Sequence, residues 1–253
     1  MIKIQMNNYT KYTEIIRTEL KKISSAEKIK STQRYFPHGI TCIVATASDI
    51  KTIISNFHIN NPSLSANKVL GITEEVLKNS QYSEEVMVAY GLINKFVKKN
   101  YDDDLLLRFE YWLENYSNNW ALVDDLCIKT IYNFLFHRPH LIEKTQHWSR
   151  SKVSWCRRAS NVVWVKFIKR KMGKSIYYLD KNLVFQNCDI LLSDEDEFVQ
   201  KSVGWLLKVT SLQYDEDVIN YIQDNYKSME RSTIKYSLEK FPKDTRQEIL
   251  QLK

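Results

Sequence analysis

The sequence has few of the residues that end helices or form tight turns, with five glycines and four prolines in 253 residues. An all-β sandwich needs turn residues every ~8–12 positions, and an α/β nucleotide-binding fold needs a glycine-rich loop after a strand. Neither pattern is present. A Walker loop, a nucleophile elbow and a Ser-His-Asp arrangement are also missing, which argues against a conventional hydrolase or nucleotide enzyme.

Cysteine pairs and long apolar runs are missing too. The cysteines stand far apart without a CxxC pair, which indicates buried thiols in a reducing compartment; they are Cys42, Cys127, Cys156 and Cys188. No apolar run reaches the ~18 residues of a membrane span, and residues 1–8 lack the apolar core of a signal peptide. We therefore predict a cytoplasmic protein without membrane contact.

The histidines show no metal-ligand spacing. His38, His58, His137, His140 and His147 form no HExxH or comparable motif. His137 and His140 flank a predicted helix junction, where surface or capping roles are expected. The sequence thus predicts no metal and no cofactor.

The excess of basic residues is modest. Lysine and arginine total 37 and aspartate and glutamate total 30, which gives a formal net charge of +7. Such an excess suits a polyanion such as DNA or RNA, although many basic proteins bind neither. Charge alone therefore leaves nucleic-acid binding open.

Hydrophobic residues recur with the period of an α-helix along most of the chain. Val86, Tyr90, Ile93 and Val97 follow the i, i+4, i+7, i+11 spacing of one buried helix face. The triplet Ser-Glu-Glu at 83–85 predicts a serine cap with carboxylates in the first turn of this helix. Further helices are predicted to begin near Thr46, Pro62, Asp102, Asn118, Pro139, Lys152, Asp194, Asp215 and Glu230.

The helix count and the short connectors favour an all-helical fold. About a dozen helices in pairs of ~40 residues are typical of HEAT-type repeats, although no repeat consensus is present. No linker divides the chain, and residues 171–181, the least regular segment, are interpreted as a connection between helices. We therefore predict one all-α domain over residues 1–253, a curved superhelical stack of HEAT-like antiparallel helix pairs with a concave binding surface.

The first candidate site lies in residues 118–125. Trp120 and Asp124 are four residues apart, so on a helix they share one face. An aromatic ring can hold a sugar or a base while a neighbouring carboxylate stabilises a developing positive charge. The alternative is a core tryptophan beside an ordinary acid.

The second candidate site is a basic segment. Adjacent arginines point about 100° apart on a helix, so at least one of the pair at 157–158 can face a phosphate. On a continuing helix, the cations at 166, 169 and 170 would share one face. Aromatic residues interleave with these cations, as in a groove that follows a nucleic-acid backbone, whereas the alternative is a solvated helix surface. The candidate DNA contacts are Lys152, Arg157, Arg158, Lys166, Lys169 and Arg170.

The third candidate site spans residues 194–208. Acidic residues at its start and lysines later agree with the helix dipole. Gly204 within this predicted helix indicates close packing, since glycine costs ~1 kcal/mol relative to alanine there. Trp205 is either a core residue or a second aromatic plate.

Four strings, in order along the chain, resemble the DNA alkylation-repair family with HEAT-like repeats, the AlkD-like glycosylases. They are NNWALVDDLC (118–127), WCRRAS (155–160), DEDEFVQKSVGWLLK (194–208) and MERSTIKYSLEKFP (229–242). QRYFPHGI (33–40) is a weaker likeness, so the resemblance covers nearly the full chain.

The resemblance implies an enzyme that excises N3- or N7-alkylated purines by hydrolysing the N-glycosidic bond. It places Asp124 at the catalytic acid, Trp120 and Trp205 at the sugar-facing tryptophans, and Arg158 at the DNA-contacting arginine. Cleavage develops oxocarbenium character on deoxyribose, which a carboxylate beside C1′ stabilises while it orients water. Most glycosylases flip the base into a pocket, whereas this family acts without a snug base pocket. We expect double-stranded DNA as the partner of a monomeric, nucleoid-associated protein.

Two departures from the family pattern keep other functions open. Ser31 falls where active members carry an aromatic residue, with Tyr35 or Phe36 as substitutes, and the connection at 171–181 looks longer than in compact members. The runner-up function is a non-catalytic DNA-binding member of the same fold, for damaged or branched DNA. A third is a HEAT-like protein-interaction scaffold, for which exposed apolar grooves are expected.

Overall fold

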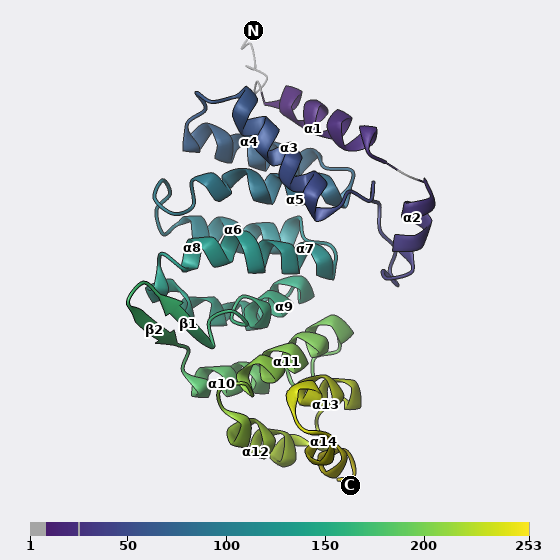
Figure 1. The fold of residues 1–253 in the computed structure, drawn as a ribbon, viewed down its shortest axis with the longest axis vertical. Helices are drawn as coiled ribbons and strands as arrows, with labels where there is room; N and C mark the ends of the chain where they lie inside the picture. The colour runs from purple at the N-terminus through teal and green to yellow at the C-terminus, as the bar shows by residue number, and fades with distance from the viewer. Residues whose placement is uncertain (1–8, 25, 253) are drawn as a thin grey trace. The chain divides into compact units, whose positions relative to one another are not determined.

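The computed structural model describes residues 9–24 and 26–252 of the chain. These residues are mostly helical, with α-helices α1–α14 and one two-stranded sheet, so the predicted all-α class is confirmed (Figure 1). Internal contacts divide the chain into two compact units, Met1–Leu105 with Asn115–Asn133, and Leu106–Glu114 with Phe134–Lys253. The single domain, the curvature and the antiparallel pairing stay predictions.

The first unit packs around α5. Its elements are α1 (Thr10–Lys22), α2 (Ala26–Gln33), α3 (Ala47–Asn60), α4 (Ala66–Asn79), α5 (Ser83–Leu92), the 3-10 turn η1 (Ile93–Lys95), α7 (Trp120–Asp125) and the π-helical turn η2 (Leu126–Ile131). α5 contacts α1, α3 and α4, and α1 also contacts α4. The burial predicted for Val86, Tyr90, Ile93 and Val97 is confirmed, since each is at most 4% exposed. Their placement on one helix is wrong, because α5 ends at Leu92, Ile93 lies in η1 and Val97 lies in the turn after it.

The second unit packs around α11. Its elements are α6 (Leu105–Asn115, without its two end residues), the end of α8 (Tyr132–Leu135), η3 (Pro139–Leu141), η4 (Glu143–Arg150), α9 (Ser154–Val162), β1 (Lys169–Met172), β2 (Ser175–Tyr178), α10 (Lys181–Leu191), α11 (Glu197–Thr210), α12 (Asp215–Asn225), α13 (Arg231–Ser237), η5 (Leu238–Lys240) and α14 (Lys243–Leu250). α11 contacts α9, α10 and α13. A Cβ at Gly204 would lie 3.0 Å from the backbone oxygen of Thr233, so the predicted close packing is confirmed.

Two predicted helix starts in the first unit have different outcomes. Thr46 caps α3: its hydroxyl accepts from the backbone N–H of Asp49, whose carboxylate accepts from the backbone N–H of Thr46. The start predicted at Pro62 is wrong, because α4 begins at Ala66 and Ser65 is its cap. Ser65 lies three residues after Pro62, and the helix begins after this serine cap rather than at the proline.

Ser83 does not cap α5, and the two carboxylates that follow it do more than complement the helix dipole. Ser83 is the first helical residue rather than the residue before it. Glu84 accepts hydrogen bonds at 2.9 and 2.6 Å from the backbone N–H groups of residues 43–44. Glu85, fully buried, pairs with Arg17 at 2.6 Å. Both acids therefore fix distant segments onto the start of α5.

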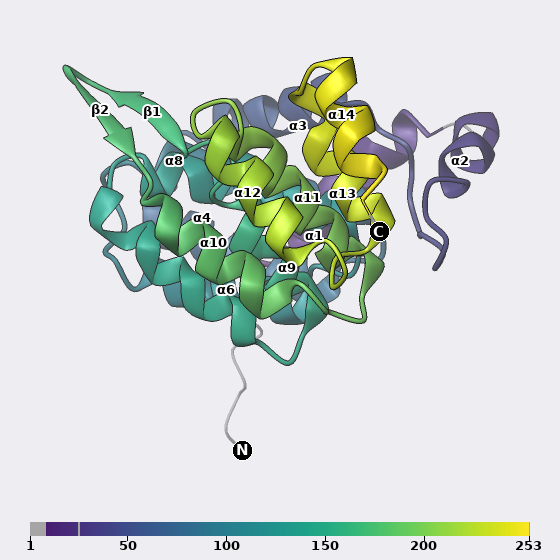
Figure 2. The same cartoon turned by 90° about the horizontal axis from the view of Figure 1, so that it is seen from below.

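The predicted connection at 171–181 contains a β-hairpin. β1 and β2 pair antiparallel with Met172 opposite Ser175, which leaves Gly173 and Lys174 as a two-residue turn. Gly173 has φ +63, as such turns require at this position. Figure 2 shows the hairpin projecting from the helices of its unit.

The helical interpretation of the basic segment is therefore wrong. α9 ends at Val162, and β1 begins at Lys169. Because side chains alternate along a strand, Lys169 and Arg170 point to opposite faces and cannot share one helix face with Lys166. A two-residue turn with glycine in the left-handed region closes the hairpin instead of continuing the helix.

The cysteines are buried and form no disulfide, as predicted. Burial raises the pKa of the Cys156 thiol to about 12, so it stays protonated at neutral pH unless a bound cation displaces the proton. Among the helices of the described residues, none combines the length and apolar character of a membrane span.

Candidate functional site

α7 places Trp120 and Asp124 on one helix, as the spacing predicts. The side chain of Asn119 accepts hydrogen bonds from the backbone N–H groups of Ala121 and Leu122, at 3.0 and 3.1 Å, and so caps this helix. Trp120 is the first residue of α7, and Asp124 follows about one turn later. Both residues are half-buried. One face of α7 thus carries an aromatic ring and a carboxylate.

The indole of Trp120 is held by the segment that follows α2. The ring of Phe36 stacks on it, with centroids 5.4 Å apart and planes at 13°. The indole N–H donates to the backbone oxygen of Tyr35 at 3.4 Å, while the Tyr35 side chain is 63% exposed. Ser31 is exposed within α2 and accepts hydrogen bonds from Arg34. Of the two aromatic substitutes for Ser31, Phe36 is therefore the one whose ring contacts Trp120.

A second carboxylate, that of Asp125, follows Asp124 directly. Burial raises its pKa above the ordinary value and the charge of Asp124 raises it further, whereas the hydrogen bond from Lys129 lowers it. Lys129 lies one turn further along and donates its ammonium hydrogen to Asp125. The sequence alone does not show which acid is bound in this way, since the burial of Asp125 and its bond from Lys129 depend on the fold.

α7 continues directly into the π-helical turn η2. Such turns occur frequently at functional sites, since the extra residue changes where side chains point. The hydroxyl of Thr130 donates to the backbone oxygen of Tyr90 at 2.9 Å, and the hydroxyls of Tyr90 and Ser117 lie 2.8 Å apart in a hydrogen bond. η2 is thereby tied to α5. No local sequence pattern predicts this turn.

In the second unit, Arg157 is bound to neighbouring acceptors. It donates to the two carboxylate oxygens of Asp194 at 2.6 and 3.1 Å. It also donates to the backbone oxygens of Ser151 and Lys152, both at 3.1 Å. These bonds raise its pKa, chiefly through Asp194. The guanidinium therefore joins the start of α9 to the loop before α11.

Arg158 and Trp205 both belong to the packed pair α9 and α11. Arg158 is 5% exposed and donates to the backbone oxygen of Phe198 at 2.6 Å, in the first turn of α11. The ring of Trp155 also lies against Phe198, with centroids 5.5 Å apart. Trp205 lies about two turns further along α11 and is half-buried.

The cations of the basic segment are exposed. Lys152 precedes α9, Lys166 lies in the turn after it, and Lys169 and Arg170 lie in β1. Residues 166–174 include five cations and no acid. We call residues 169–178 the basic hairpin. Its positive charge and exposure suit contact with a polyanion.

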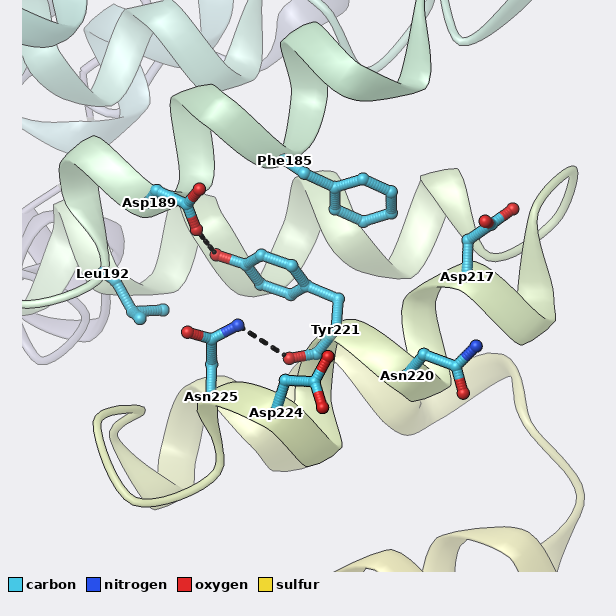
Figure 3. A pocket seen from close by; sticks show the side chains of 8 residues that line it. All are labelled: Phe185, Asp189, Leu192, Asp217, Asn220, Tyr221, Asp224 and Asn225. Carbon is cyan, nitrogen blue, oxygen red and sulfur yellow. Dashed lines mark hydrogen bonds between the residues drawn. The ribbon is translucent and has the colours of Figure 1, made fainter.

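A cavity of about 620 Å³ lies between α10 and α12 and holds none of the predicted site residues (Figure 3). The Tyr221 hydroxyl donates to Asp189 at 2.8 Å, and the Tyr221 ring stacks on Phe185 at 4.9 Å. Asp217 pairs with Lys181 at 2.7 Å. The residues that line the cavity are Phe185, Asp189, Leu192, Asp217, Asn220, Tyr221, Asp224 and Asn225. Three carboxylates repel phosphates, so this cavity is unsuited to a DNA backbone.

These features define a mostly helical protein with an aromatic residue and a carboxylate on one helix and with an exposed basic hairpin. A family model described as a DNA alkylation repair enzyme matches residues 16–241. The chain belongs to the DNA alkylation repair enzyme family. No curated protein matches the chain.

Solved structures share the fold at low sequence identity. A predicted DNA alkylation repair enzyme from Enterococcus faecalis superposes with a TM-score of 0.74 at 14% identity, over 87% of this chain and 97% of that one. AlkD2 from Streptococcus mutans gives 0.58 at 16%, over 84% and 98%. The protein smu.31 from Streptococcus mutans UA159 gives 0.53 at 18%, over 77% and 98%.

Proposed function

We propose that the protein is a DNA glycosylase that excises N3- and N7-alkylated purines from double-stranded DNA. The observation that carries the proposal is the pair Trp120 and Asp124, one turn apart on α7 in a chain of the DNA alkylation repair family. An alkylated purine carries a positive charge and leaves as a neutral base when the N-glycosidic bond breaks. The reaction therefore depends on stabilising positive charge on the sugar more than on protonating the leaving base.

Each residue on α7 has a distinct role in the proposal. Asp124 stabilises the oxocarbenium-like deoxyribose and orients the water that adds to C1′. Trp120 holds the sugar against the face of its ring, and Trp205 of α11 acts as the second aromatic plate. Asp125 is bound to Lys129, so its role is to fix the helix rather than to meet the sugar.

The proposal assigns DNA phosphates to the cations of the second unit. Lys152, Lys166, Lys169 and Arg170 are exposed, so their charges can meet a phosphate backbone. Arg158 is 5% exposed and donates to the backbone oxygen of Phe198, so its assignment as a DNA contact rests on the family pattern alone. Arg157 acts through its pairing with Asp194, which holds the start of α9 in place.

A second function, DNA binding without excision, is favoured by the stacking of Phe36 on Trp120. The stack covers one face of the indole and leaves less ring area for a sugar. The cations of the second unit serve this function equally well. The two functions differ in whether the carboxylate of Asp124 acts on bound DNA.

Release of 7-methylguanine and 3-methyladenine from alkylated duplex DNA tests the proposal. We expect Asp124→Asn to slow release by about 10²–10³-fold, as the loss of one group that stabilises transition-state charge commonly does. Asp125→Asn is the matched control, since it neutralises the adjacent carboxylate and leaves Asp124 in place. Duplex binding by both variants shows that the fold is intact.

The outcomes separate the two functions. Release by the wild type that is unaffected by Asp124→Asn contradicts the assigned role of Asp124. Duplex binding without release by the wild type establishes the binding function instead. Absence of duplex affinity at physiological salt contradicts both.

A further inference from the structure

Side chains that can bind a metal ion meet between α6 and α9 in the second unit. Glu110 and Glu114 lie one turn apart on α6, and Cys156 lies in the first turn of α9. One ligand atom from each of the three lies within 4.8 Å of the other two. Cys156 is fully buried. We propose that Glu110, Glu114 and Cys156 bind one zinc ion.

Two hydrogen-bonded neighbours hold the carboxylates of this cluster. His147 of η4 has Nε2 at 3.0 and 2.9 Å from the two carboxylate oxygens of Glu110. Its Nδ1 lies 2.6 Å from the backbone oxygen of Lys144, so both ring nitrogens face acceptors and the imidazolium donates Nδ1–H to Lys144 and Nε2–H to Glu110. The hydroxyl of Ser151 donates to Glu114 at 2.6 Å. Carboxylate ligands of metals are oriented by hydrogen bonds of this kind.

The electrostatics of the cluster favour a cation. Two glutamates one turn apart on a helix repel each other. Two cations lie near the cluster: His147 pairs with Glu110, and Arg157, one residue after Cys156, is bound to Asp194. A divalent ion between the carboxylates would offset their repulsion and join α6 to α9.

The donor set selects zinc. Cysteine sulfur is a soft ligand and carboxylate oxygen a hard one, and zinc, which is borderline, accepts both. Ligand atoms about 2.0–2.3 Å from a tetrahedral zinc lie about 3.5 Å from one another. The ligand atoms here lie within 4.8 Å of one another, so zinc binding requires them to move about an ångström closer together. Zinc motifs built on histidine spacing do not include this cluster, because its ligands come from helices far apart in the sequence and none of the three is a histidine.

Titration of the purified full-length protein with zinc chloride against a chromophoric chelator tests the site. We expect one zinc per chain in the wild type. With cobalt chloride as the probe, a thiolate-to-cobalt charge-transfer band is expected in the near ultraviolet. Cys156→Ser removes that band, and His147→Gln lowers zinc affinity by about 10–100-fold, as the loss of an orienting partner does.

Cys188→Ser is the matched control, because Cys188 is an equally buried thiol in α10. It should keep both the band and the zinc. If Cys156→Ser fails to fold, Glu114→Gln on α6 provides a second variant. It should weaken zinc binding. Wild-type protein that binds no zinc, or a cobalt band that survives Cys156→Ser, overturns the proposal.

Discussion

The ring of Phe36 lies parallel to the indole of Trp120, 5.4 Å away and tilted by 13°. The two residues are far apart in the sequence, and the hydrogen bond from the indole N–H to the Tyr35 backbone oxygen fixes the same contact from a second direction. The segment after α2 therefore sets the position of the tryptophan that the proposed chemistry uses. Any change at Phe36 acts on the candidate site through this ring.

A double-mutant cycle measures how strongly the two rings are coupled. We expect Phe36→Ala and Trp120→Ala to be non-additive by about 0.5–1.5 kcal/mol in the free energy of unfolding, as for other stacked aromatic pairs. Urea unfolding of the wild type, the single variants and the double variant gives this number. Tyr35→Ala is the control: it removes an exposed ring and keeps the backbone oxygen, so it should show no coupling to Trp120. Additive effects of Phe36→Ala and Trp120→Ala would show that the stack contributes nothing.

The buried carboxyl of Asp125 gives stability a specific pH dependence. Its folded-state pKa is raised above the ordinary value, mainly by burial. A raised pKa means that the folded state holds the proton more tightly than the unfolded state does. This contribution to stability is fully present below the unfolded pKa and is lost as pH rises through the folded pKa.

Asp125→Asn keeps the uncharged form at every pH, so the variant should gain stability relative to wild type as pH rises from about 4 to 7. Urea unfolding of both proteins over this range measures the difference. A difference that stays constant with pH would contradict the raised pKa. Asp124→Asn, measured in parallel, shows how much of the effect comes from the neighbouring charge.

The pair Arg17 and Glu85 is expected to be a large single contribution to the stability of the first unit. The carboxylate of Glu85 is fully buried and also accepts from the backbone N–H groups of residues 81–82. Glu85→Ala should lower the free energy of unfolding by about 3–5 kcal/mol, because it removes the buried carboxylate that the Nε–H of the buried Arg17 guanidinium binds. Glu14→Ala removes an exposed partner of the same arginine and should cost at most about 1 kcal/mol. Equal losses in the two variants, measured by urea unfolding, would contradict this account.

Periodicity predicted the helical class, because burial of one helix face leaves a mark at every turn. Capping residues located the start of α3 at Thr46, and the start of α7 was predicted near Asn118, one residue before the observed cap Asn119. The periodic pattern was less informative elsewhere. It misjudged Ser83–Glu85, because the two carboxylates serve partners in distant segments. It missed the hairpin around Gly173, since the two four-residue strands are almost entirely exposed and show no alternation of buried and exposed residues.

The candidate site was predictable where it depends on local spacing and unpredictable where it depends on tertiary packing. The spacing of Trp120 and Asp124 is local, and the structure places both on α7. The stack of Phe36 on Trp120 depends on how α2 meets the rest of its unit, and no spacing reports that contact. For Arg157 the sequence shows a cation, but only the packing of α9 against the loop before α11 reveals that Asp194 binds it.

The basic hairpin should contribute to duplex affinity through its charge. Removing one cation that binds a phosphate lowers the slope of log affinity against log salt by about 0.9. Replacing both Lys169 and Arg170 with glutamine should therefore reduce the slope by about twice that amount, since both side chains are exposed. Lys181→Gln is the matched control, because the Lys181 ammonium is bound to Asp217 at 2.7 and 2.8 Å and is not expected to bind a phosphate. Binding of a fluorescent duplex at several salt concentrations measures the slopes of the wild type and both variants. If the hairpin variant and the control shift the slope equally, the phosphates contact another surface of the second unit, with Lys152 and Lys166 the next cations to replace.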